Sequence, residues 1–459
     1  MPPVDEITLA SSRGPKEVRI VPEVASMLAR HRHHIEIVSS LVVIQFFTLI
    51  VGFITQIKIA NTLGKEVFGQ LAFGLALGAC GQVVIRFGLD RTLVRDLIHD
   101  PEHTAKIVRA SLVLRYSITA LVVSALLLWK MVFSASDAGW GLMFIVIGNS
   151  ILSLDLQPVY DAWQKIRRHA VYYLIQRGIY FGVVWLTIFL FPGELTIHWL
   201  GLATLGTVLM YLFLQHRWAM RQLPPVPVGK KLFGEVFDLA RRNLWVWFAA
   251  LSGLFLVQFN QLILKRYMGY AELGSYAAGW QIVMVGMLFL EQVARIGRPA
   301  TARHTRPEVP SGVRKRFLVK YSIVMLAAVL PIVLIMTCFP GLIYKYVYTQ
   351  EYATGSNILP VFGIYLLVVS LGMVSSQYIL AIKKEFMYLV SVLVGGVISI
   401  FFCGYLIPNM GQGGAAWAVL LSHGTSILIY SAVMVHDVGN RSKQHIPAAL
   451  GIRGHAPGK

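Results

Sequence analysis

Long apolar runs separated by short polar stretches make up most of the chain. Each run has about the 20 residues that an α-helix needs to cross the hydrocarbon core of a bilayer. The pattern therefore predicts an all-α polytopic membrane protein with twelve membrane-spanning helices in two six-helix bundles. The predicted spans cover 37–60, 67–90, 107–133, 139–160, 170–191, 196–215, 243–267, 273–296, 317–343, 355–381, 386–407 and 413–435.

Polar segments divide these spans into two series. A linker over 216–242 separates an N-terminal bundle, 37–215, from a C-terminal bundle, 243–435, and polar tails occupy 1–36 and 436–459. The linker ends in KKLFGEVFDLARR, whose apolar residues fall toward one side of a helix. It therefore predicts an amphipathic helix on the membrane surface.

A repeat relates the two series. At a constant offset of 205 residues, small and polar residues of the first hairpin recur in the seventh and eighth spans. Small residues at helical spacing let neighbouring helices approach closely in lipid. We interpret the chain as two homologous halves; the alternative is two unrelated glycine-rich hairpins. Because each half has an even number of spans, a pseudo-twofold axis along the membrane normal should relate the halves. The matched positions are Gln56 and Gln261, Gly64 and Gly269, Gly69 and Gly274, Ala72 and Ala277, Gly74 and Gly279, and Gly81 and Gly286.

The composition leaves no room for a soluble catalytic domain, because 56% of the 459 residues are hydrophobic and only 14% are charged. We therefore expect a protein that is not an enzyme and has no cofactor. The polar start of the chain predicts no cleavable signal peptide. The three cysteines all lie inside apolar runs, which favours a packing role over disulfides or a metal site.

The net charge of +19 would suggest nucleic acid as a partner in a soluble protein. Its distribution gives another explanation. If the N-terminus is cytoplasmic, the tails and inner loops hold 32 of the 41 Lys and Arg residues. An excess of basic residues in cytoplasmic segments is the usual rule for membrane proteins. The asymmetry predicts that both termini are cytoplasmic and explains the charge without nucleic acid. The outer segments hold six basic residues, namely Lys58, Lys65, Lys130, Lys265, Arg266 and Lys345.

Three segments resemble the polysaccharide flippases of the multidrug/oligosaccharidyl-lipid/polysaccharide exporter superfamily. They are LGKEVFGQLAFGLAL…IRFGLDRTLVRDL, with its glycine turn and Gly-Leu before basic residues, then QPVYDAWQKIRRHAVYYLIQRGIYF, and GYLIPNMGQGGAAWAVLLS. In the second segment Arg177 stands where the family has an Arg or Lys early in the fifth span. The resemblance covers most of residues 37–435.

The resemblance implies a function. Such family members carry polyprenyl-diphosphate-linked oligosaccharides from the inner to the outer leaflet of the bacterial cytoplasmic membrane. We therefore expect alternating access, with two bundles rocking around a central basic cavity. The implied partners are the lipid-linked glycan, the bilayer and the polysaccharide polymerase or export machinery. Many relatives have an acidic residue in the seventh span where this chain has Asn260, which puts cation coupling through that span in doubt.

Three arginines lie at membrane depth and are candidates for binding the diphosphate: Arg86, Arg115 and Arg177. A charged side chain there costs about 2.5–3.5 kcal/mol on insertion scales, so it indicates a function. Guanidinium groups are permanently charged and bind phosphate oxygens in bidentate fashion. The alternatives are snorkelling to the headgroups and a buried pair with Asp155.

Uncharged polar residues gather in the seventh span at Gln258, Asn260 and Gln261, with Gln56 equivalent in the first span. Their side chains have the donors and acceptors to bind sugar hydroxyls. They could equally hydrogen-bond neighbouring helices. The sequence leaves both interpretations open.

A cytoplasmic gate follows from the repeat. At the 205-residue offset, Arg86 falls on Glu291 and Asp90 falls on Arg295, so the charges are inverted between the halves. Across a pseudo-twofold axis, Arg86 would face Glu291 and Asp90 would face Arg295 when the cytoplasmic side is closed. The alternative is that each helix pairs its own charges at i, i+4 spacing.

Three other functions remain as alternatives. A drug/cation antiporter of the same superfamily needs intramembrane carboxylates, which the first and seventh spans lack. A membrane sugar polymerase or ligase needs a sizeable outer loop, and the longest outer loop here is 344–357. A peptidoglycan-precursor lipid flippase is the closest alternative, although twelve spans rather than fourteen argue weakly against it.

Overall fold

The computed structural model describes residues 20–100, 102–132, 139–191, 193–224, 230–306 and 308–449. Side chains are described within these ranges except at 20–47, 91, 230–231 and 441–449. Most of the two predicted tails therefore lies outside the described side chains. Residues 51–459 form one compact unit, and the description below concerns that unit.

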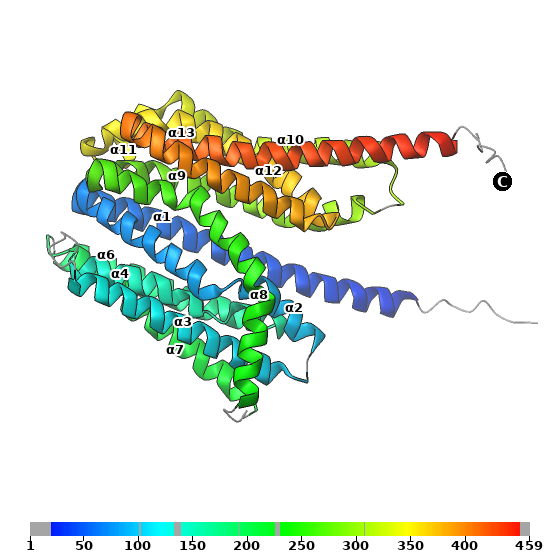
Figure 1. Ribbon diagram of the computed structural model, residues 1–459, viewed down its shortest axis with the longest axis horizontal. Helices are drawn as coiled ribbons and strands as arrows, with labels where there is room; N and C mark the ends of the chain where they lie inside the picture. The colour runs from blue at the N-terminus through cyan, green and yellow to red at the C-terminus, as the bar shows by residue number, and fades with distance from the viewer. Residues whose placement is uncertain are drawn as a thin grey trace, which may run out of the picture. The chain divides into compact units, whose positions relative to one another are not determined.

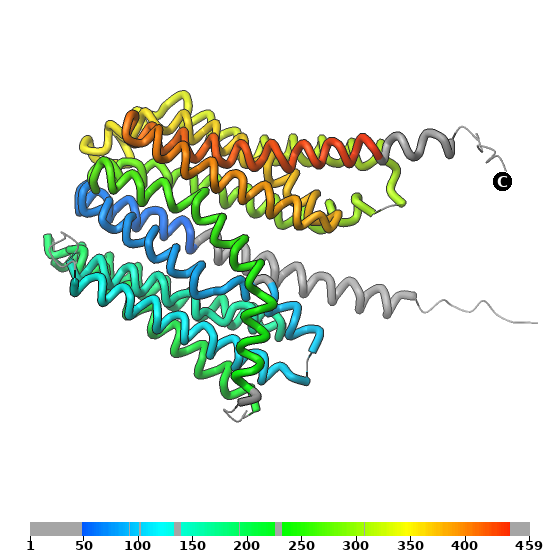
Figure 2. Tube along the Cα trace, in the orientation of Figure 1, coloured from blue at the N-terminus to red at the C-terminus, as the bar shows by residue number. Residues whose placement is uncertain are grey.

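The described residues are helical and contain no strand, as predicted (Figures 1 and 2). Two short 3-10 helices, Leu152–Leu154 and Gln350–Ile358, join the longer elements. The α-helices are α1 Ile20–Arg86, α2 Leu89–His99, α3 Thr104–Val132, α4 Trp140–Ile151, α5 Gln157–Ala162, α6 Ile166–Leu190, α7 Ile197–Gln222, α8 Lys230–Val257, α9 Phe259–His304, α10 Ser311–Cys338, α11 Pro340–Val347, α12 Leu359–Ala381 and α13 Glu385–Ala449.

Nine helical segments of the described chain are long and apolar enough to cross a membrane. Three of them are interrupted by a glycine at positive φ, a conformation that only glycine adopts without strain. These glycines are Gly64 in α1, Gly269 in α9 and Gly411 in α13, with φ of 75°, 85° and 57°. Gly64 and Gly411 each divide one segment into two spans. Gly269 separates the eighth span from residues 259–268, which complete the seventh span begun in α8, so the structure is consistent with the predicted twelve.

The structure confirms the repeat at its centre. Gly64 and Gly269, which the 205-residue offset pairs, have nearly the same backbone angles, with ψ of 168° and −174°. A Cβ on Gly69 would lie 1.9 Å from the carbonyl oxygen of Tyr270, and a Cβ on Gly274 would lie 1.9 Å from that of Lys65. Tyr270 is the residue that the offset pairs with Lys65. The contact is therefore reciprocal, as a twofold axis requires.

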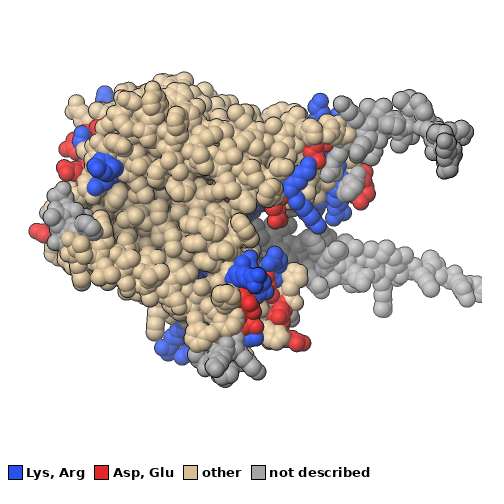
Figure 3. Space-filling model, in the orientation of Figure 1, with Lys and Arg blue, Asp and Glu red and all other residues tan. Residues whose placement is uncertain are grey.

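Charged side chains gather toward both ends of the unit, which are distinguished here by their turns. The end that holds the turns at 102–103, 163–165, 305–306 and 382–384 is called the charged end below, and the end with the three glycine turns is called the hairpin end. Figure 3 shows Lys, Arg, Asp and Glu gathered toward the ends, with an uncharged band between them. This band is what a protein in contact with lipid tails presents.

The linker helix is not a separate element. It is continuous with the seventh span in α8, which then breaks at Gln258 and continues as α9. Near its start, Leu232 and Leu239 are buried against α2 and α3. Farther along, the carbonyl of Phe255 accepts a hydrogen bond from Ser399 of α13. The helix therefore contacts both halves, while Phe233 on its other side is exposed.

The second span is shorter than predicted. It ends at Arg86, because Phe87 and Gly88 have φ of 49° and 72° and break the helix before α2. Gly88 lies against Val246 and the backbone of Trp247 in α8, where a Cβ would come within 3.0 Å of the Trp247 nitrogen. Because of this break, Arg86 ends α1 while Asp90 lies in the first turn of α2, and the site described next is built where the two helices meet.

Candidate functional site

Two arginines share one carboxylate at the charged end of the first half. Asp90 Oδ1 lies 2.9 Å from Nη2 of Arg115, and Asp90 Oδ2 lies 3.2 Å from Nη1 of Arg86. Arg115 is 0% exposed, whereas the side chains of Arg86 and Asp90 are 39% and 36% exposed. Only Arg86 of the two arginines can therefore meet a molecule from outside in this conformation.

The buried arginine leads to a second polar group. Nη1 of Arg115 donates to the backbone carbonyl of Asp155 over 3.1 Å. The Asp155 carboxylate lies 2.9 Å from Nε2 of His169, and that nitrogen lies 2.8 Å from the hydroxyl of Tyr211. The sequence offered a buried pair of Arg115 with Asp155; the structure instead pairs Arg115 with Asp90 and uses the Asp155 main chain.

Arg177 belongs to the same cluster. Its Nε donates to the hydroxyl of Tyr173 over 3.0 Å, and its guanidinium lies 5.2 Å from the centre of that ring. The Tyr173 ring meets the ring of Tyr211 edge-on at 6.3 Å. The structure thus joins the three predicted arginines in one contiguous group, called the polar cluster below. Its members are Arg86, Asp90, Arg115, Asp155, His169, Tyr173, Arg177 and Tyr211.

Further hydrogen bonds anchor the polar cluster to the fourth span. Arg86 Nη2 donates to Gln82 over 3.0 Å, and Gln82 Nε2 donates to Asn149 over 2.9 Å. Asn149 in turn donates to the carbonyl of Leu75. Arg86 is therefore held from two sides, by Gln82 and Asp90, with part of its guanidinium exposed.

Sequence reasoning missed His169, Tyr173 and Tyr211, which come together only through the packing of α6 and α7. One signal was available for Arg115. The residues Arg115 to Ile118 read RYSI, and 205 residues later the chain reads KYSI from Lys320. This match extends the repeat to the third and ninth spans. It shows that both halves have a basic residue at the position of Arg115.

The predicted sugar-binding residues lie apart from the polar cluster. Asn260 is fully buried and donates to the hydroxyl of Tyr276, which is itself fully buried. Gln56 accepts a hydrogen bond from Gln281 at 3.5 Å. These hydrogen bonds join neighbouring spans, which is the alternative to sugar binding that the sequence left open. Gln261 is also buried, and Gln258 is half-buried at the break between α8 and α9.

The predicted gate pairs are not formed in this conformation. Within the described residues, Arg86 pairs with Asp90, and Glu291 pairs with Arg298. Each half therefore satisfies these acidic groups from its own helices. Arg295, the fourth predicted gate residue, lies exposed on α9.

The hairpin end is tied together across the halves. The segment 339–358 of the second half, called the strap below, contacts the end of the first span. Asn61 donates to the carbonyl of Val347 over 2.9 Å and accepts from the backbone nitrogen of Thr349 over 3.1 Å. The hydroxyl of Tyr352 donates to the carbonyl of Ala60 over 2.9 Å. Together with the crossing of Gly69 and Gly274, the strap holds the two halves in contact at this end.

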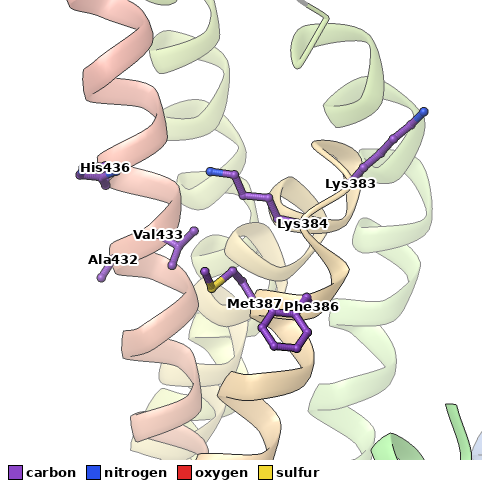
Figure 4. Close-up of a pocket in the computed structure, with 7 residues that line it drawn as sticks. All are labelled: Lys383, Lys384, Phe386, Met387, Ala432, Val433 and His436. Atoms are coloured by element: carbon purple, nitrogen blue, oxygen red, sulfur yellow. The ribbon is translucent and has the colours of Figure 1, made fainter. Parts of the chain in front are cut away.

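A pocket of about 660 Å³ lies in the second half, away from the three arginines (Figure 4). Figure 4 shows Lys384 reaching toward α13 and Lys383 pointing away from it. The Lys384 ammonium lies 3.2 Å from a carboxylate oxygen of Asp437, whose other oxygen accepts from Tyr378 over 2.8 Å. The lysine charge is thus already compensated, and the pocket offers mostly apolar walls. It is lined by Lys383, Lys384, Phe386, Met387, Ala432, Val433 and His436.

No group of three or more His, Cys, Asp or Glu side chains that could hold a metal ion occurs in the described part of the chain. Cys80, Cys338 and Cys403 are free thiols.

Comparison with protein families gives the relationship. The family described as polysaccharide biosynthesis protein matches residues 36–294, which is more than half of the chain. The chain belongs to this family. No curated protein matches it in sequence.

Solved structures show the same fold for this polysaccharide biosynthesis protein. The lipid II flippase MurJ in an inward closed conformation matches with a TM-score of 0.67 and 12% identity, covering 91% of this chain and 93% of MurJ. An inward-facing multidrug resistance MATE family transporter of the MOP superfamily matches with a TM-score of 0.61 and 14% identity, covering 86% and 96%. Its outward-facing conformation matches with a TM-score of 0.51 and 14% identity, covering 87% and 96%.

These findings confirm the predicted family resemblance and fold class. The protein is a multi-pass membrane protein with the fold of flippases and transporters. The matching solved structures are named as a flippase and as multidrug transporters.

Proposed function

We propose that the protein is a flippase that moves polyprenyl-diphosphate-linked oligosaccharide from the inner to the outer leaflet of the bacterial cytoplasmic membrane by alternating access. The polar cluster is the observation that carries this proposal. It places Arg86 and Arg177, both partly exposed, in one group at the charged end of the first half. A diphosphate that leaves bulk water needs such permanently charged, fork-shaped donors.

The charged end faces the cytoplasm in this proposal, as the distribution of basic residues predicts. The strap and the glycine crossing then close the outer side, so the conformation is one that loads substrate from the cytoplasm. The higher similarity to the inward-facing MATE transporter than to the outward-facing one supports this assignment, with TM-scores of 0.61 and 0.51.

The energy source need not be an ion gradient. A membrane potential that is negative inside favours outward movement of an anion by about 2.3 kcal/mol per charge per 100 mV. The diphosphate carries negative charge, so the potential alone drives it toward the outer leaflet. No covalent chemistry is required.

Reconstitution tests the substrate. Protein in liposomes, with a potential negative on the side of the charged end, should move a lipid-diphosphate-linked oligosaccharide at least tenfold faster than protein-free liposomes. It should not move a cationic dye. Transport of the dye alone would establish the drug/cation antiporter instead. Equal or faster transport of lipid II would establish the peptidoglycan-precursor flippase.

Cysteine labelling tests the orientation. A membrane-impermeant thiol reagent added outside cells should modify a cysteine placed at Ser136 or Gln412, and should leave one at Ser311 or Ser442 unmodified. Ser136 lies outside the described residues, and Gln412 follows the turn at Gly411. Labelling of the second pair alone would reverse the orientation.

A further inference from the structure

The buried Arg115 occupies an unusual position in the polar cluster. Its charge lies beside Asp90 at 2.9 Å, and the other oxygen of Asp90 lies 3.2 Å from Arg86. Because Arg115 is fully buried, its guanidinium cannot reach a bound lipid headgroup in this conformation. Arg86 is the member of the pair with exposed surface, at 39%.

The net charge around Asp90 indicates different roles for Arg86 and Arg115. Arg86, Asp90 and Arg115, which form direct ion pairs, together have one net positive charge, while the nearby Asp155 carboxylate pairs with His169. Removing the charge of Arg115 would leave Asp90 to neutralise Arg86 alone. Arg86 would then attract an anion weakly, although its own side chain would be intact.

The surroundings of Arg115 hold it in place for this role. The main chain of Asp155 accepts from Nη1, so the guanidinium is fixed at a second point. The break at Phe87 and Gly88 begins a new helix at Leu89, which places Asp90 between the two arginines. A second carboxylate near Arg86 is not among the ion pairs of the described residues; Glu291 pairs with Arg298.

We propose that Arg115 is a positioning residue: it binds and neutralises Asp90 so that Arg86 keeps its charge for a phosphate group of the lipid-linked substrate. The inference deepens the proposed function and rests on it. It assigns direct phosphate contact to Arg86 and Arg177, and an indirect role to Arg115.

A second-site rescue tests this inference. Binding of a short-chain polyprenyl diphosphate to purified protein is measured by calorimetry for Arg115→Met, Asp90→Asn and the double variant. Arg115→Met should weaken binding at least tenfold, and Asp90→Asn should tighten it severalfold, because it removes the carboxylate that competes with phosphate for Arg86. The double variant should return to within about threefold of the parent, because it removes both the Arg115 charge and the Asp90 carboxylate and leaves the charge of Arg86 free. A double variant as weak as Arg115→Met would make Arg115 a direct ligand and overturn the inference.

A measurement without ligand separates this inference from the proposed function. Cysteine replaces Arg86 in a variant whose native cysteines are removed, and its labelling by cationic and anionic methanethiosulfonate reagents is compared. Arg115→Met should raise the cationic-to-anionic rate ratio at Cys-substituted position 86 severalfold, and adding Asp90→Asn should reverse the rise. An unchanged ratio would overturn the positioning role even if the substrate assignment holds. If instead the ratio responds and no diphosphate binds, the proposed substrate fails and the charge arrangement stands.

Matched controls accompany both measurements. Arg298→Cys, beside Glu291 in the second half, should give a rate ratio that does not respond to Arg115→Met. Arg115→Lys keeps the charge and should retain most of the binding, even though it loses the fork. Size-exclusion profiles identify any variant that does not fold. If Arg115→Met does not fold, Arg115→Lys supplies the comparison: because it keeps the charge beside Asp90, it should leave the rate ratio within twofold of the value with Arg115, and a severalfold rise counts against the inference.

Discussion

Each half contains a turn of the same backbone conformation, but the side chains around the two turns differ. The turn between α5 and α6 and the turn between α12 and α13 each contain a residue at positive φ, Gln164 at 57° and Lys383 at 58°. In each, the next backbone nitrogen, of Lys165 or Lys384, donates to a carbonyl five residues earlier, over 2.8 Å and 3.1 Å. The two turns are related by an offset of 219 residues.

The side chains around these turns differ in kind. At the 219-residue offset, Tyr211 corresponds to Tyr430 and His169 corresponds to Tyr388. The rings meet at similar distances, 6.2 Å for His169 with Tyr211 and 6.1 Å for Tyr388 with Tyr430. Asp155, however, corresponds to the apolar Val374. The backbone turn is therefore duplicated. The ion pair of Asp155 with His169 in the first half is replaced at the equivalent positions of the second half by Val374 and Tyr388, and Tyr388 packs against Tyr430.

This difference has a consequence for transport. If an anionic headgroup binds at the charged end, the first half binds it, and the second half supplies the surface against which the first half moves. Symmetric parts of the fold should respond equally to mutation, and the charged side chains should respond unequally. The following predictions test that division.

The largest effect is expected at the symmetric crossing. Gly69→Val and Gly274→Val each place carbon atoms against a backbone carbonyl that would lie 1.9 Å from Cβ. Overpacking costs about 1–3 kcal/mol when neighbours can adjust, and backbone adjusts poorly, so both variants should lose about 3 kcal/mol or more of stability. Thermal unfolding in detergent measures it.

The control for the crossing is Gly404→Val, since a Cβ there meets nothing within 4 Å. It should unfold close to the parent temperature. A large loss at Gly69 with little loss at Gly274 would break the twofold equivalence of the crossing.

The next effect is the unequal response of basic residues. Arg177→Ala should reduce affinity for a polyprenyl diphosphate about 10- to 100-fold, since a hydrogen bond to a charged group contributes about 1.5–3 kcal/mol. Lys384→Ala, in the second half, should change it less than about threefold, because Asp437 already compensates that lysine. Similar losses in both variants would show that the halves share the anion.

A charge swap separates two roles of Arg86. Arg86→Glu should abolish glycan export, because it replaces the phosphate-binding charge. Adding Glu291→Arg should leave export abolished if Arg86 binds phosphate directly, because the second change does not return a positive charge to position 86. Restored export in the double variant would establish the cross-half gate of Arg86 with Glu291 and remove Arg86 from phosphate binding. Export is measured by surface glycan in cells, with membrane levels of each variant as the control.

The smallest effect is expected at the strap. Asn61→Ala removes two hydrogen bonds between the halves, and Tyr352→Phe removes one. At about 1 kcal/mol for each bond, the hairpin end should open about 5-fold more often in Tyr352→Phe and more in Asn61→Ala. Spin-label distances across the hairpin end measure the open fraction.

Tyr344→Phe is the matched control for the strap. The Tyr344 hydroxyl donates to the carbonyl of Ser275 in its own half, over 3.2 Å. This variant should not change the open fraction. An equal shift in all three variants would indicate general loosening of the strap rather than a contact between the halves.

The sequence by itself determined the spans, their duplication and the positions of the turns. Apolar runs of membrane length can fold in lipid only as helices, and a glycine such as Gly64 or Gly269 indicates where a helix can bend backward. Four glycines at one offset predicted two halves related by a twofold axis, and the structure adds that Gly69 and Gly274 meet across that axis. The three membrane arginines were also visible, because charge is rare at that depth.

The tertiary structure alone decided what each arginine does. The repeat aligns Arg115 with Lys320, yet Arg115 is buried and Lys320 is exposed, because the two helices turn different faces inward. The partner of Arg115 is Asp90 rather than the Asp155 carboxylate, since a break at Phe87 and Gly88 redirects the chain. Sequence spacing sets which residues can share a helix face, but which face is buried depends on neighbours that lie far away along the chain. His169 and Tyr211, 42 residues apart, meet for the same reason.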